Sequence, residues 1–398
     1  MRKRKIVVSY YEMMVGGSTT SLLAFLNCID KEKYEVDLQL YRNRGELLNE
    51  IPETVNLLPE ACMYKGRAGN LIKKIKYVLT GTFFKARKFK KTTGKNGYAL
   101  SEFQAKHLSK KSNKEYDYAI GFLEGWADRY IAYNVTANTK YAWIHSTFRN
   151  LATVPDFEKD WLKRIDNVVF VADNCAEEFK KDLPDFSNKV ITIRNIVDSD
   201  LLNKRAEKID ENDSEYIRFR KADCLKIITV CRIDINTKGL DRVIKCAEYL
   251  KNNGREFLWY IVGDGPDQEK LKNMIFSHGV EGGVVAIGNR INPAPFIREA
   301  DIFCMPSRYE GKPMVITESM ILGTPPFVTR YLSAPEQIEN GVDGIIVDNE
   351  DDTMLAVLDR FIDNPDQLLP MKEYLLTHEY GNSDYMREIE EKFLNVGA

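Results

Sequence analysis

The sequence predicts an α/β protein built from two doubly wound parallel sheets, one after the other along the chain. At 398 residues the chain is too long for a single ordinary core. Short apolar runs, typical of parallel strands buried on both faces, alternate with helical patterns in both halves. A highly charged segment without core residues, 204–213, separates the halves. We therefore expect two domains, 1–198 and 199–379, with a C-terminal segment, 380–398, whose helix packs back on the first.

The first half contains seven short apolar runs, each of which predicts a strand. Gly16 and Gly17 follow the first run, and a helix is expected from Ser18 to about Cys28. Paired glycines let the start of that helix come close to a ligand, so they are candidate binding residues. The predicted strands are residues 6–10, 36–41, 54–58, 118–122, 140–144, 168–171 and 190–193.

The second half repeats the pattern with six further runs, and helices are expected at 239–250 and 267–276. In doubly wound sheets ligands bind outside the carboxyl ends of the strands, so residues that directly follow a strand are the first candidates for a site. The predicted strands are residues 225–230, 257–262, 284–287, 302–305, 326–329 and 344–347.

The segment 307–318 joins one of these strands to a short helix through a tight loop. Pro313 suits the first turn of the helix, where its missing N–H costs nothing. The free N–H groups near Met314 and Val315 then form an anion site. This segment therefore predicts a phosphate-binding helix start.

Two glutamates lie in the same segment, Glu310 in the loop and Glu318 in the second helical turn. A carboxylate beside an anion site is costly unless it faces another group, such as sugar hydroxyls. A nucleotide-sugar diphosphate, which is an anion with hydroxyls on either side, satisfies both demands. The alternative is that Glu310 caps the helix dipole and Glu318 is solvated.

Two cations follow the first strand of the second half, Arg232 at its end and Lys238 at the start of the next helix. Both are expected to point to the carboxyl edge, where they could neutralise a diphosphate leaving group without a metal. The alternative is a surface loop with solvated charges. Together with the segment 307–318, these cations favour the diphosphate interpretation.

Two other candidates also follow strands. His145 could contact a sugar or phosphate, with a hydrogen-bonded structural histidine as the alternative. Arg290 could touch a base or ribose. The glycine turn at 263–266 is interpreted as a packing turn, because Pro266 offers no N–H to a phosphate.

Neither a metal nor a cofactor is expected. The Asp-x-Asp spacing at 198–200 falls at the domain junction, where Asp198 suits a helix cap. The seven cysteines contain no CxxC pair, as expected of reduced core residues in a cytosolic protein. No apolar run approaches the roughly 18 residues of a bilayer span, and the apolar run after the basic N-terminus is too short for a signal peptide.

The net charge of −2 hides an uneven distribution, because residues 61–114 contain fifteen Lys/Arg and one acid, Glu102. Within this region, residues 71–95 interleave apolar and cationic side chains, a pattern typical of a segment that lies on an anionic membrane surface. The alternative is a solvated helical hairpin whose apolar residues face the first domain. Nucleic acid is a weaker partner, because no binding module accompanies the charge.

In order and spacing, these residues resemble a retaining glycosyltransferase of the GT-B fold, in family 4 (glycosyltransferase group 1). The resemblance covers nearly the whole chain and is strongest over 232–347. It departs from the family at Ser319, where alanine is usual, and at 331–333, where a glycine pair is usual near donor-sugar contacts. The matching features are the E-x7-E pattern of Glu310 and Glu318, the diphosphate contacts Arg232 and Lys238, the glycine loop Gly16-Gly17, Asn195–Asp198, Gly323-Thr324-Pro325 and 340–344.

The resemblance implies two Rossmann-like domains that face each other across a cleft, the first for the acceptor and the second for the donor. It implies transfer of a hexosyl group from a nucleotide sugar, by default a UDP-sugar, to a glycan hydroxyl with retained configuration, in capsule or cell-surface polysaccharide synthesis. The implied catalytic residues are His145, Arg232, Lys238 and Glu310. The implied donor-binding residues are Gly16, Gly17, Arg232, Lys238, Arg290, Glu310, Gly311, Met314, Val315 and Glu318.

An acceptor carried on a polyprenyl diphosphate would place the protein in the cytoplasm, peripherally on the inner face of the plasma membrane. Two other functions stay open. A nucleotide-sugar epimerase of related fold would convert the donor without an acceptor. A non-catalytic subunit would bind the donor in support of another transferase, although the presence of both glutamates and both cations argues against it.

Overall fold

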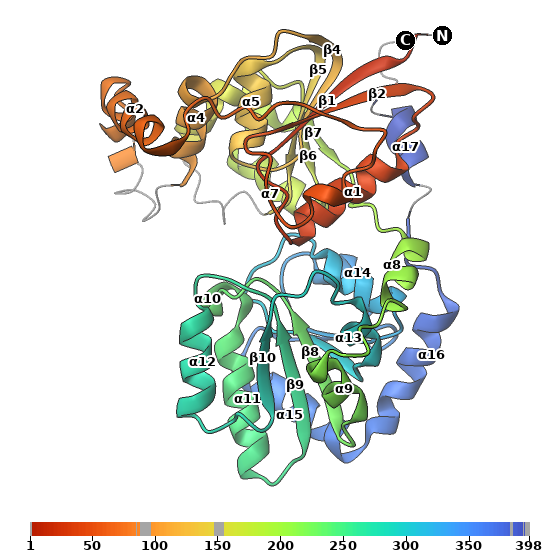
Figure 1. Cartoon of the computed structure of the whole chain (residues 1–398). Helices are drawn as coiled ribbons and strands as arrows, with labels where there is room; N and C mark the ends of the chain where they lie inside the picture. The colour runs from red at the N-terminus through yellow and green to blue at the C-terminus, as the bar shows by residue number, and fades with distance from the viewer. Residues whose placement is uncertain are drawn as a thin grey trace. The chain divides into compact units, whose positions relative to one another are not determined.

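The computed structural model describes residues 2–84, 86–87, 97–146, 155–382, 385–392 and 394. The chain forms two compact units, residues 1–195 with 384–398 and residues 196–383 (Figure 1). Each unit is built on one parallel sheet with helices packed against it. The predicted fold class, two doubly wound parallel sheets, is confirmed.

The first unit contains a seven-stranded sheet in the order β3-β2-β1-β4-β5-β6-β7. The order reverses between β1 and β4, so the loops after these strands leave the carboxyl edge at the switch point where doubly wound sheets bind ligands. The strands are β1 Arg4–Tyr10, β2 Tyr34–Leu40, β3 Asn56–Leu57, β4 Glu115–Gly121, β5 Thr136–Ile144, β6 Asn167–Phe170 and β7 Val190–Thr192. The helices are α1 Gly17–Cys28, α2 Gly66–Leu79, α4 Gly97–Leu108, α5 Trp126–Asn134, α6 Pro155–Leu162, α7 Asp173–Asp182 and α17 Tyr385–Lys392, with 3-10 turns η1 Leu48–Glu50 and η3 Pro184–Lys189.

The second unit contains a six-stranded sheet in the order β10-β9-β8-β11-β12-β13, with its switch point between β8 and β11. The strands are β8 Leu225–Val230, β9 Phe257–Val262, β10 Val284–Gly288, β11 Ile302–Met305, β12 Pro326–Thr329 and β13 Ile345–Val347. The helices are α8 Ser199–Ala206, α9 Ser214–Lys221, α10 Ile235–Lys238, α11 Leu240–Asn252, α12 Gln268–Ser277, α13 Ala294–Glu299, α14 Met314–Ile321, α15 Asp351–Asp363 and α16 Leu369–Thr377, with 3-10 turns η4 Ala334–Glu336 and η5 Pro365–Leu368.

The central strands of both sheets are buried on their two faces, which is why they read as apolar runs in the sequence. In the second unit, Ile227 and Trp259 belong to the core on one face, and Ile228 and Tyr260 to the core on the other. The strand β3 is shorter than the predicted 54–58, because it pairs with β2 through Asp37 and Leu38 alone.

Helix α17 packs on the first unit, although it follows the whole second unit in the chain. Glu390 accepts the backbone N–H of Asp30 at 2.8 Å, and the guanidinium of Arg4 donates to the carbonyl of Leu394 at 2.7 Å. Among the residues that the structure describes, no helix is both long enough and apolar enough to cross a membrane.

Candidate functional site

The loop between β11 and α14 carries the site of the second unit, and its neighbours hold it rigidly. Arg308 donates two hydrogen bonds to the carboxylate of Asp241, at 2.7 and 2.8 Å. The hydroxyl of Thr329 donates to the carbonyl of Ser307 at 2.6 Å, and the hydroxyl of Ser333 donates to the carbonyl of Gly311. The loop therefore has little freedom to move relative to α11 and the end of β12.

The short helix α10 lies directly against this loop. Gly239, which ends α10 with φ of +64°, is so close that a Cβ there would lie 2.0 Å from the carbonyl oxygen of Pro306. Only glycine fits this approach and this backbone conformation. As a result, Lys238 at the end of α10 is brought to the start of the loop that carries Glu310.

Lys238 and Glu310 form an ion pair at this point, with Nζ and Oε1 2.7 Å apart. The hydroxyl of Ser307 donates to the same Glu310 oxygen at 2.6 Å. Burial opposes the charge of Lys238, but the attraction of Glu310 outweighs it and raises the pKa of Lys238 above its usual value. The pair therefore keeps a fixed ammonium group and a fixed carboxylate side by side next to α14.

Helix α14 begins with no side-chain cap and no acid in its first turn. Pro313 takes the N-cap position, one residue before the position predicted for it, and has no N–H of its own. Met314 is buried and Val315 is half-buried, so the helix start is shielded while its first N–H groups stay available. This arrangement suits an anion next to the Lys238 ammonium.

Glu318 lies one turn further along α14, and burial raises its pKa to about 7, with Arg205 opposing the shift. Its carboxylate makes no hydrogen bond to any residue that the structure describes. Glu318 is half-buried, and a carboxylate that has lost part of its water without gaining donors is costly in the ligand-free protein and favourable when a hydroxyl-bearing ligand supplies them.

Arg232 follows β8, is exposed, and makes no ion pair within the described part of the chain. Its loop is held by the glycine turn 263–266, since a Cβ on Gly265 would lie 2.3 Å from the carbonyl oxygen of Ile233. The N–H of Ile233 also donates to the carbonyl of Asp264 at 2.9 Å. The glycine turn thus packs against the Arg232 loop, and the Arg232 guanidinium itself stays available to a ligand.

Arg290, in contrast, is already engaged by its own surroundings. Its guanidinium donates to the carbonyl of Ile287 at 2.8 Å, lies 3.3 Å from the carboxylate of Asp213, and is 5.9 Å from the ring centre of Phe296. These contacts anchor the loop after β10, and a donor contact by Arg290 would have to compete with them.

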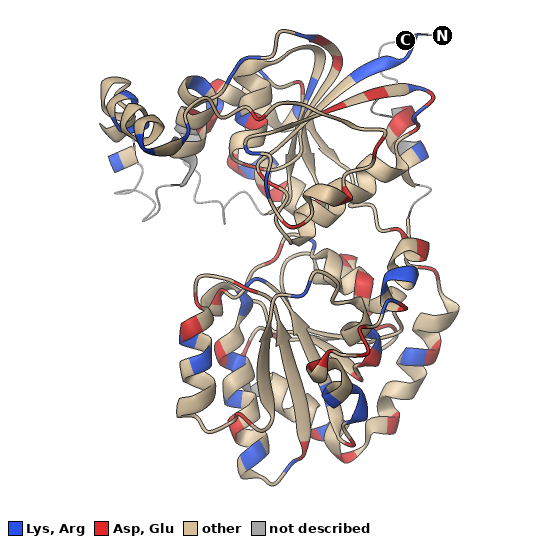
Figure 2. Cartoon of the chain, viewed as in Figure 1, with Lys and Arg blue, Asp and Glu red and all other residues tan. Residues whose placement is uncertain are grey.

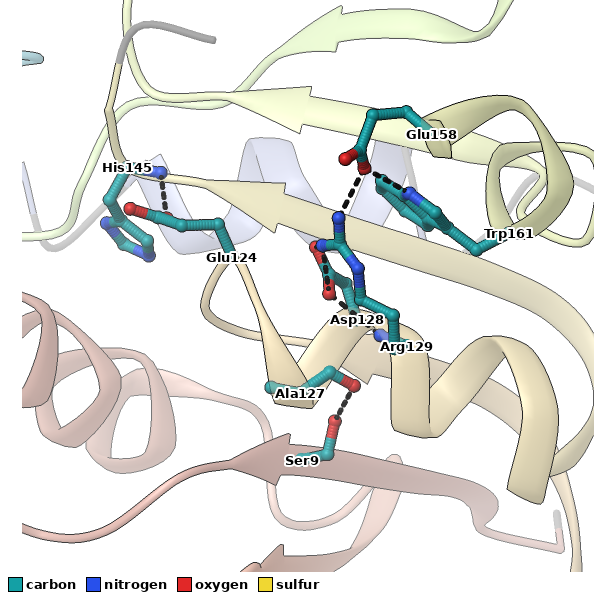
Figure 3. Close-up of polar contacts among 8 residues, drawn as sticks. All are labelled: Ser9, Glu124, Ala127, Asp128, Arg129, His145, Glu158 and Trp161. Carbon is teal, nitrogen blue, oxygen red and sulfur yellow. Dashed lines mark hydrogen bonds and ion pairs between the residues drawn. The ribbon is translucent and has the colours of Figure 1, made fainter. Parts of the chain in front are cut away.

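In the first unit, Glu124 bridges the two residues that follow β5, and Figure 3 shows its contact with the first of them, His145. One carboxylate oxygen accepts the backbone N–H of His145 at 2.9 Å, and the other accepts the hydroxyl of Ser146 at 3.0 Å. The His145 ring lies 3.1 Å from the carbonyl of Phe122 through Nε2. Burial lowers the pKa of His145 and Glu124 opposes this, so the imidazole is held neutral at the carboxyl edge.

Sequence reasoning overlooked Glu124. The signal that could have found it is its place three residues after the end of β4, at the same sheet edge as His145. Only the fold shows that its carboxylate turns toward the end of β5.

A second carboxylate network in Figure 3 is structural. Arg129 is 3% exposed and donates to Asp128 at 2.8 Å and to Glu158. Glu158 also accepts the indole N–H of Trp161 at 2.6 Å. Burial raises the pKa of Asp128 to about 7, and the Arg129 guanidinium opposes the shift. The network joins α5 to α6.

Gly16 and Gly17 lie at the start of α1, next to the end of β1. A Cβ at either position would meet no atom within 4 Å, so the space above this helix start is open. Nearby, the Tyr10 hydroxyl is 2.7 Å from that of Ser18 and 3.1 Å from that of Thr19. The start of α1 therefore combines open backbone with a group of hydroxyls.

No group of three or more His, Cys, Asp or Glu side chains that could hold a metal ion occurs among the described residues. The predicted cap at Asp198 is confirmed, since its carboxylate accepts the N–H of Leu201 at 2.9 Å at the start of α8. Lys238 and the uncapped helix start place positive charge at the α14 site, and Arg205 acts on Glu318 one turn further along.

Residues 214–375 match the sequence model of the family described as "Glycosyl transferases group 1". An uncharacterized glycosyltransferase of Haemophilus influenzae is 29% identical over 157 residues, which are 38% of this chain and 44% of that protein. The putative colanic acid biosynthesis glycosyltransferase WcaL of Escherichia coli is 31% identical over 142 residues, which are 33% of this chain and 34% of that protein. The chain thus spans less than half the length of these curated relatives.

Two solved structures resemble the chain over nearly its whole length. Anabaena HepE in complex with UDP and glucose has a TM-score of 0.67 at 14% identity, covering 99% of this chain and 100% of HepE. WaaG, a glycosyltransferase involved in lipopolysaccharide biosynthesis, has a TM-score of 0.65 at 12% identity, covering 99% of this chain and 100% of WaaG. At these identities the likeness shows the fold, which is the two-sheet GT-B fold.

Proposed function

We propose that this protein is a retaining glycosyltransferase, on the premise that residues 214–375 match the glycosyl transferases group 1 model. It transfers a hexosyl group from a nucleotide-diphosphate sugar, with UDP as the nucleotide, to a hydroxyl of a glycan acceptor. The observation that carries the proposal is the Lys238–Glu310 pair, 2.7 Å apart, beside the uncapped start of α14. A cation, a carboxylate and free N–H groups together suit a sugar diphosphate.

The residues divide the chemistry between them. Arg232, Lys238 and the N–H groups at the start of α14 stabilise the negative charge that develops on the departing diphosphate. Glu318 accepts hydrogen bonds from ribose hydroxyls. Glu310 accepts hydrogen bonds from the sugar being moved, and neutral His145 contributes a further hydrogen bond to that sugar.

The proposed reaction uses no protein nucleophile and no metal ion. The acceptor hydroxyl attacks the anomeric carbon on the face that the diphosphate leaves, and an oxygen of the leaving phosphate takes the hydroxyl proton. The new glycosidic bond forms as the bond to the phosphate breaks, so the anomeric configuration is retained. Fixed cations supply the charge that a divalent ion would otherwise supply.

Relatives named for colanic acid and lipopolysaccharide synthesis support an acceptor in cell-surface polysaccharide assembly. We place the acceptor on a polyprenyl diphosphate, and the protein as a peripheral protein on the cytoplasmic face of the membrane. Lys and Arg residues of the first unit, coloured blue in Figure 2, would supply the positive charge for such anionic groups.

A panel of nucleotide sugars tests the proposal, with the purified protein in EDTA, a lipid-linked glycan acceptor, and NMR of the product. The expected result is one donor consumed, UDP released, and the donor's anomeric configuration in the product. Complete loss of turnover in EDTA, restored by Mg²⁺ or Mn²⁺, would contradict the metal-free mechanism. Conversion of the donor sugar without an acceptor would identify an epimerase instead.

A further inference from the structure

The stripe of α2 that faces the protein contains a glycine, a lysine and a tyrosine. Gly69 is the buried residue of this helix. Seven and eight residues later, Lys76 donates to the carbonyl of His107 at 3.2 Å, and the Tyr77 ring lies 5.4 Å from that of Phe103 on α4. Residues at this spacing share one side of a helix, so α2 rests on α4 through that side. Figure 1 shows α2 beside α4 at the outer edge of the first unit.

The opposite stripe is apolar and exposed. Leu71, Ile75 and Val78 recur at i, i+4 and i+7, and are 60%, 49% and 57% exposed. Leu79 extends the stripe and is 79% exposed, and Phe84, in the helical segment that follows Gly81, is 68% exposed. In an ordinary surface helix the apolar stripe faces the core, so α2 is turned the other way round. Contiguous apolar surface of this kind marks an interaction site.

Cations border this apolar stripe. Arg67 and Lys74 are exposed, and each lies one helical turn before an apolar residue of the stripe, Leu71 and Val78 respectively. No acid occurs in the sequence from residue 61 to residue 101. Residues 85 and 88–96, the remainder of the predicted membrane segment, lie outside the described residues.

We propose that α2 docks on an anionic phospholipid surface. Leu71, Ile75 and Val78 enter the boundary between headgroups and acyl chains, while Arg67 and Lys74 lie among the anionic headgroups. A basic helix with one apolar face binds such a surface through both contributions.

Charge complementarity selects this partner over others. A second copy of the chain would bring the same cations against these cations, so self-association through α2 is opposed by repulsion. A nucleic acid would satisfy the cations but leave the apolar stripe in water. The inference does not rest on sugar transfer, because binding to vesicles is measured whether or not the protein turns over a donor.

Cosedimentation of the full chain with vesicles tests the proposal, using phosphatidylcholine alone and phosphatidylcholine mixed with phosphatidylglycerol. The intact protein is expected to bind the anionic vesicles and to bind the neutral ones far less. At roughly 1 kcal/mol per basic residue, Arg67→Glu with Lys74→Glu should lower the partition coefficient about thirty-fold or more. Leu71→Gln with Ile75→Gln should also weaken binding, and unfolding temperature should not change because both positions are exposed.

Helix α12 of the second unit supplies matched controls. Lys270→Glu with Lys272→Glu makes the same change in net charge at exposed positions, and Phe276→Gln removes an apolar side chain that is 75% exposed. Both controls should bind anionic vesicles as the intact protein does. Equal losses of vesicle binding in the α2 and α12 variants would overturn the proposal, because binding would then depend on net charge alone.

Three further results would overturn it. One is equal binding to neutral and anionic vesicles, and another is no binding to anionic vesicles. The third is a concentration-dependent dimer in sedimentation velocity that Leu71→Gln with Ile75→Gln abolishes, in which case α2 is a self-association surface. Sugar transfer without vesicle binding refutes this inference alone, whereas vesicle binding without transfer refutes the proposed activity alone.

Discussion

Replacing Lys238 by methionine tests whether the Lys238–Glu310 pair has both a structural and a chemical role. The two charged atoms are 2.7 Å apart, and the side chains are 20% and 9% exposed. At an effective dielectric constant of about 20 their attraction is about 6 kcal/mol before desolvation is counted. Removing one partner of a buried pair costs about 3–5 kcal/mol. Because Lys238 keeps some solvent contact, we expect about 3 kcal/mol for Lys238→Met.

Calorimetric unfolding measures this loss. For a unit of this size, 1 kcal/mol corresponds to about 2–4 °C, so the transition of the second unit should fall by about 6–12 °C. The double variant Lys238→Met with Glu310→Gln leaves no unpaired carboxylate and should recover most of the stability. Lys272→Met on α12 is the control, because its pair with Glu269 is exposed and worth less than about 1 kcal/mol.

Activity should behave differently from stability. Losing the ammonium group removes charge stabilisation from the leaving diphosphate, and kcat should fall about 10²–10³-fold in the single variant and at least as far in the double variant, which also loses the Glu310 carboxylate. Recovery of transfer in the double variant would show that Lys238 acts only through the fold. A single variant that unfolds at the unaltered temperature would refute the magnitude worked out for the pair.

Three further substitutions are predicted. Because the pKa of Glu318 is raised, its ionised carboxylate destabilises the folded protein increasingly as the pH rises from about 4.5 through 7. Glu318→Gln removes this cost, so its free energy of unfolding should exceed that of the unaltered protein by a margin that grows over this range to at most about 3 kcal/mol. Urea unfolding at several pH values measures the margin. Glu124→Gln replaces one accepting oxygen by an amide nitrogen, so it cannot accept hydrogen bonds from both His145 and Ser146. The value of kcat/KM should fall about ten-fold or more and its pH profile should move, while the affinity for UDP stays unchanged. An unaltered pH profile would contradict a positioning role for Glu124. Arg129→Ala leaves two buried carboxylates unpaired and should cost about 3–5 kcal/mol by urea unfolding, whereas a loss below about 1 kcal/mol would refute the buried network.

The strands were predictable because a parallel strand covered on both faces leaves a short apolar run in the sequence. The second unit illustrates this, since β8 and β9 begin and end at the predicted residues. The length of β3 was overestimated, because an edge strand has one neighbouring strand and extends only as far as the two strands pair.

The candidate site was predictable from the sequence only to the extent that its residues directly follow strands. The sequence placed Lys238 and Glu310 at the same sheet edge, but their pairing depends on the close approach of Gly239 to Pro306, which no local pattern encodes. Arg290 follows a strand in the same way, yet Ile287 and Asp213 engage it.

The orientation of α2 could not be predicted from the sequence. A helix with one apolar and one basic stripe gives the same pattern whether its apolar side faces the core or the solvent. The contacts of Gly69, Lys76 and Tyr77 with their neighbours decide between the two, and they turn the apolar stripe outward.

Titration calorimetry with UDP in EDTA tests whether Lys238, Arg232 and the start of α14 bind a nucleoside diphosphate. Saturable one-to-one binding to the intact protein is expected. Hydrogen bonds to charged groups contribute about 1.5–3 kcal/mol, so Arg232→Ala should weaken this binding about ten-fold to a hundred-fold. No binding of UDP, or equal affinity in the intact protein and Arg232→Ala, would contradict the claim.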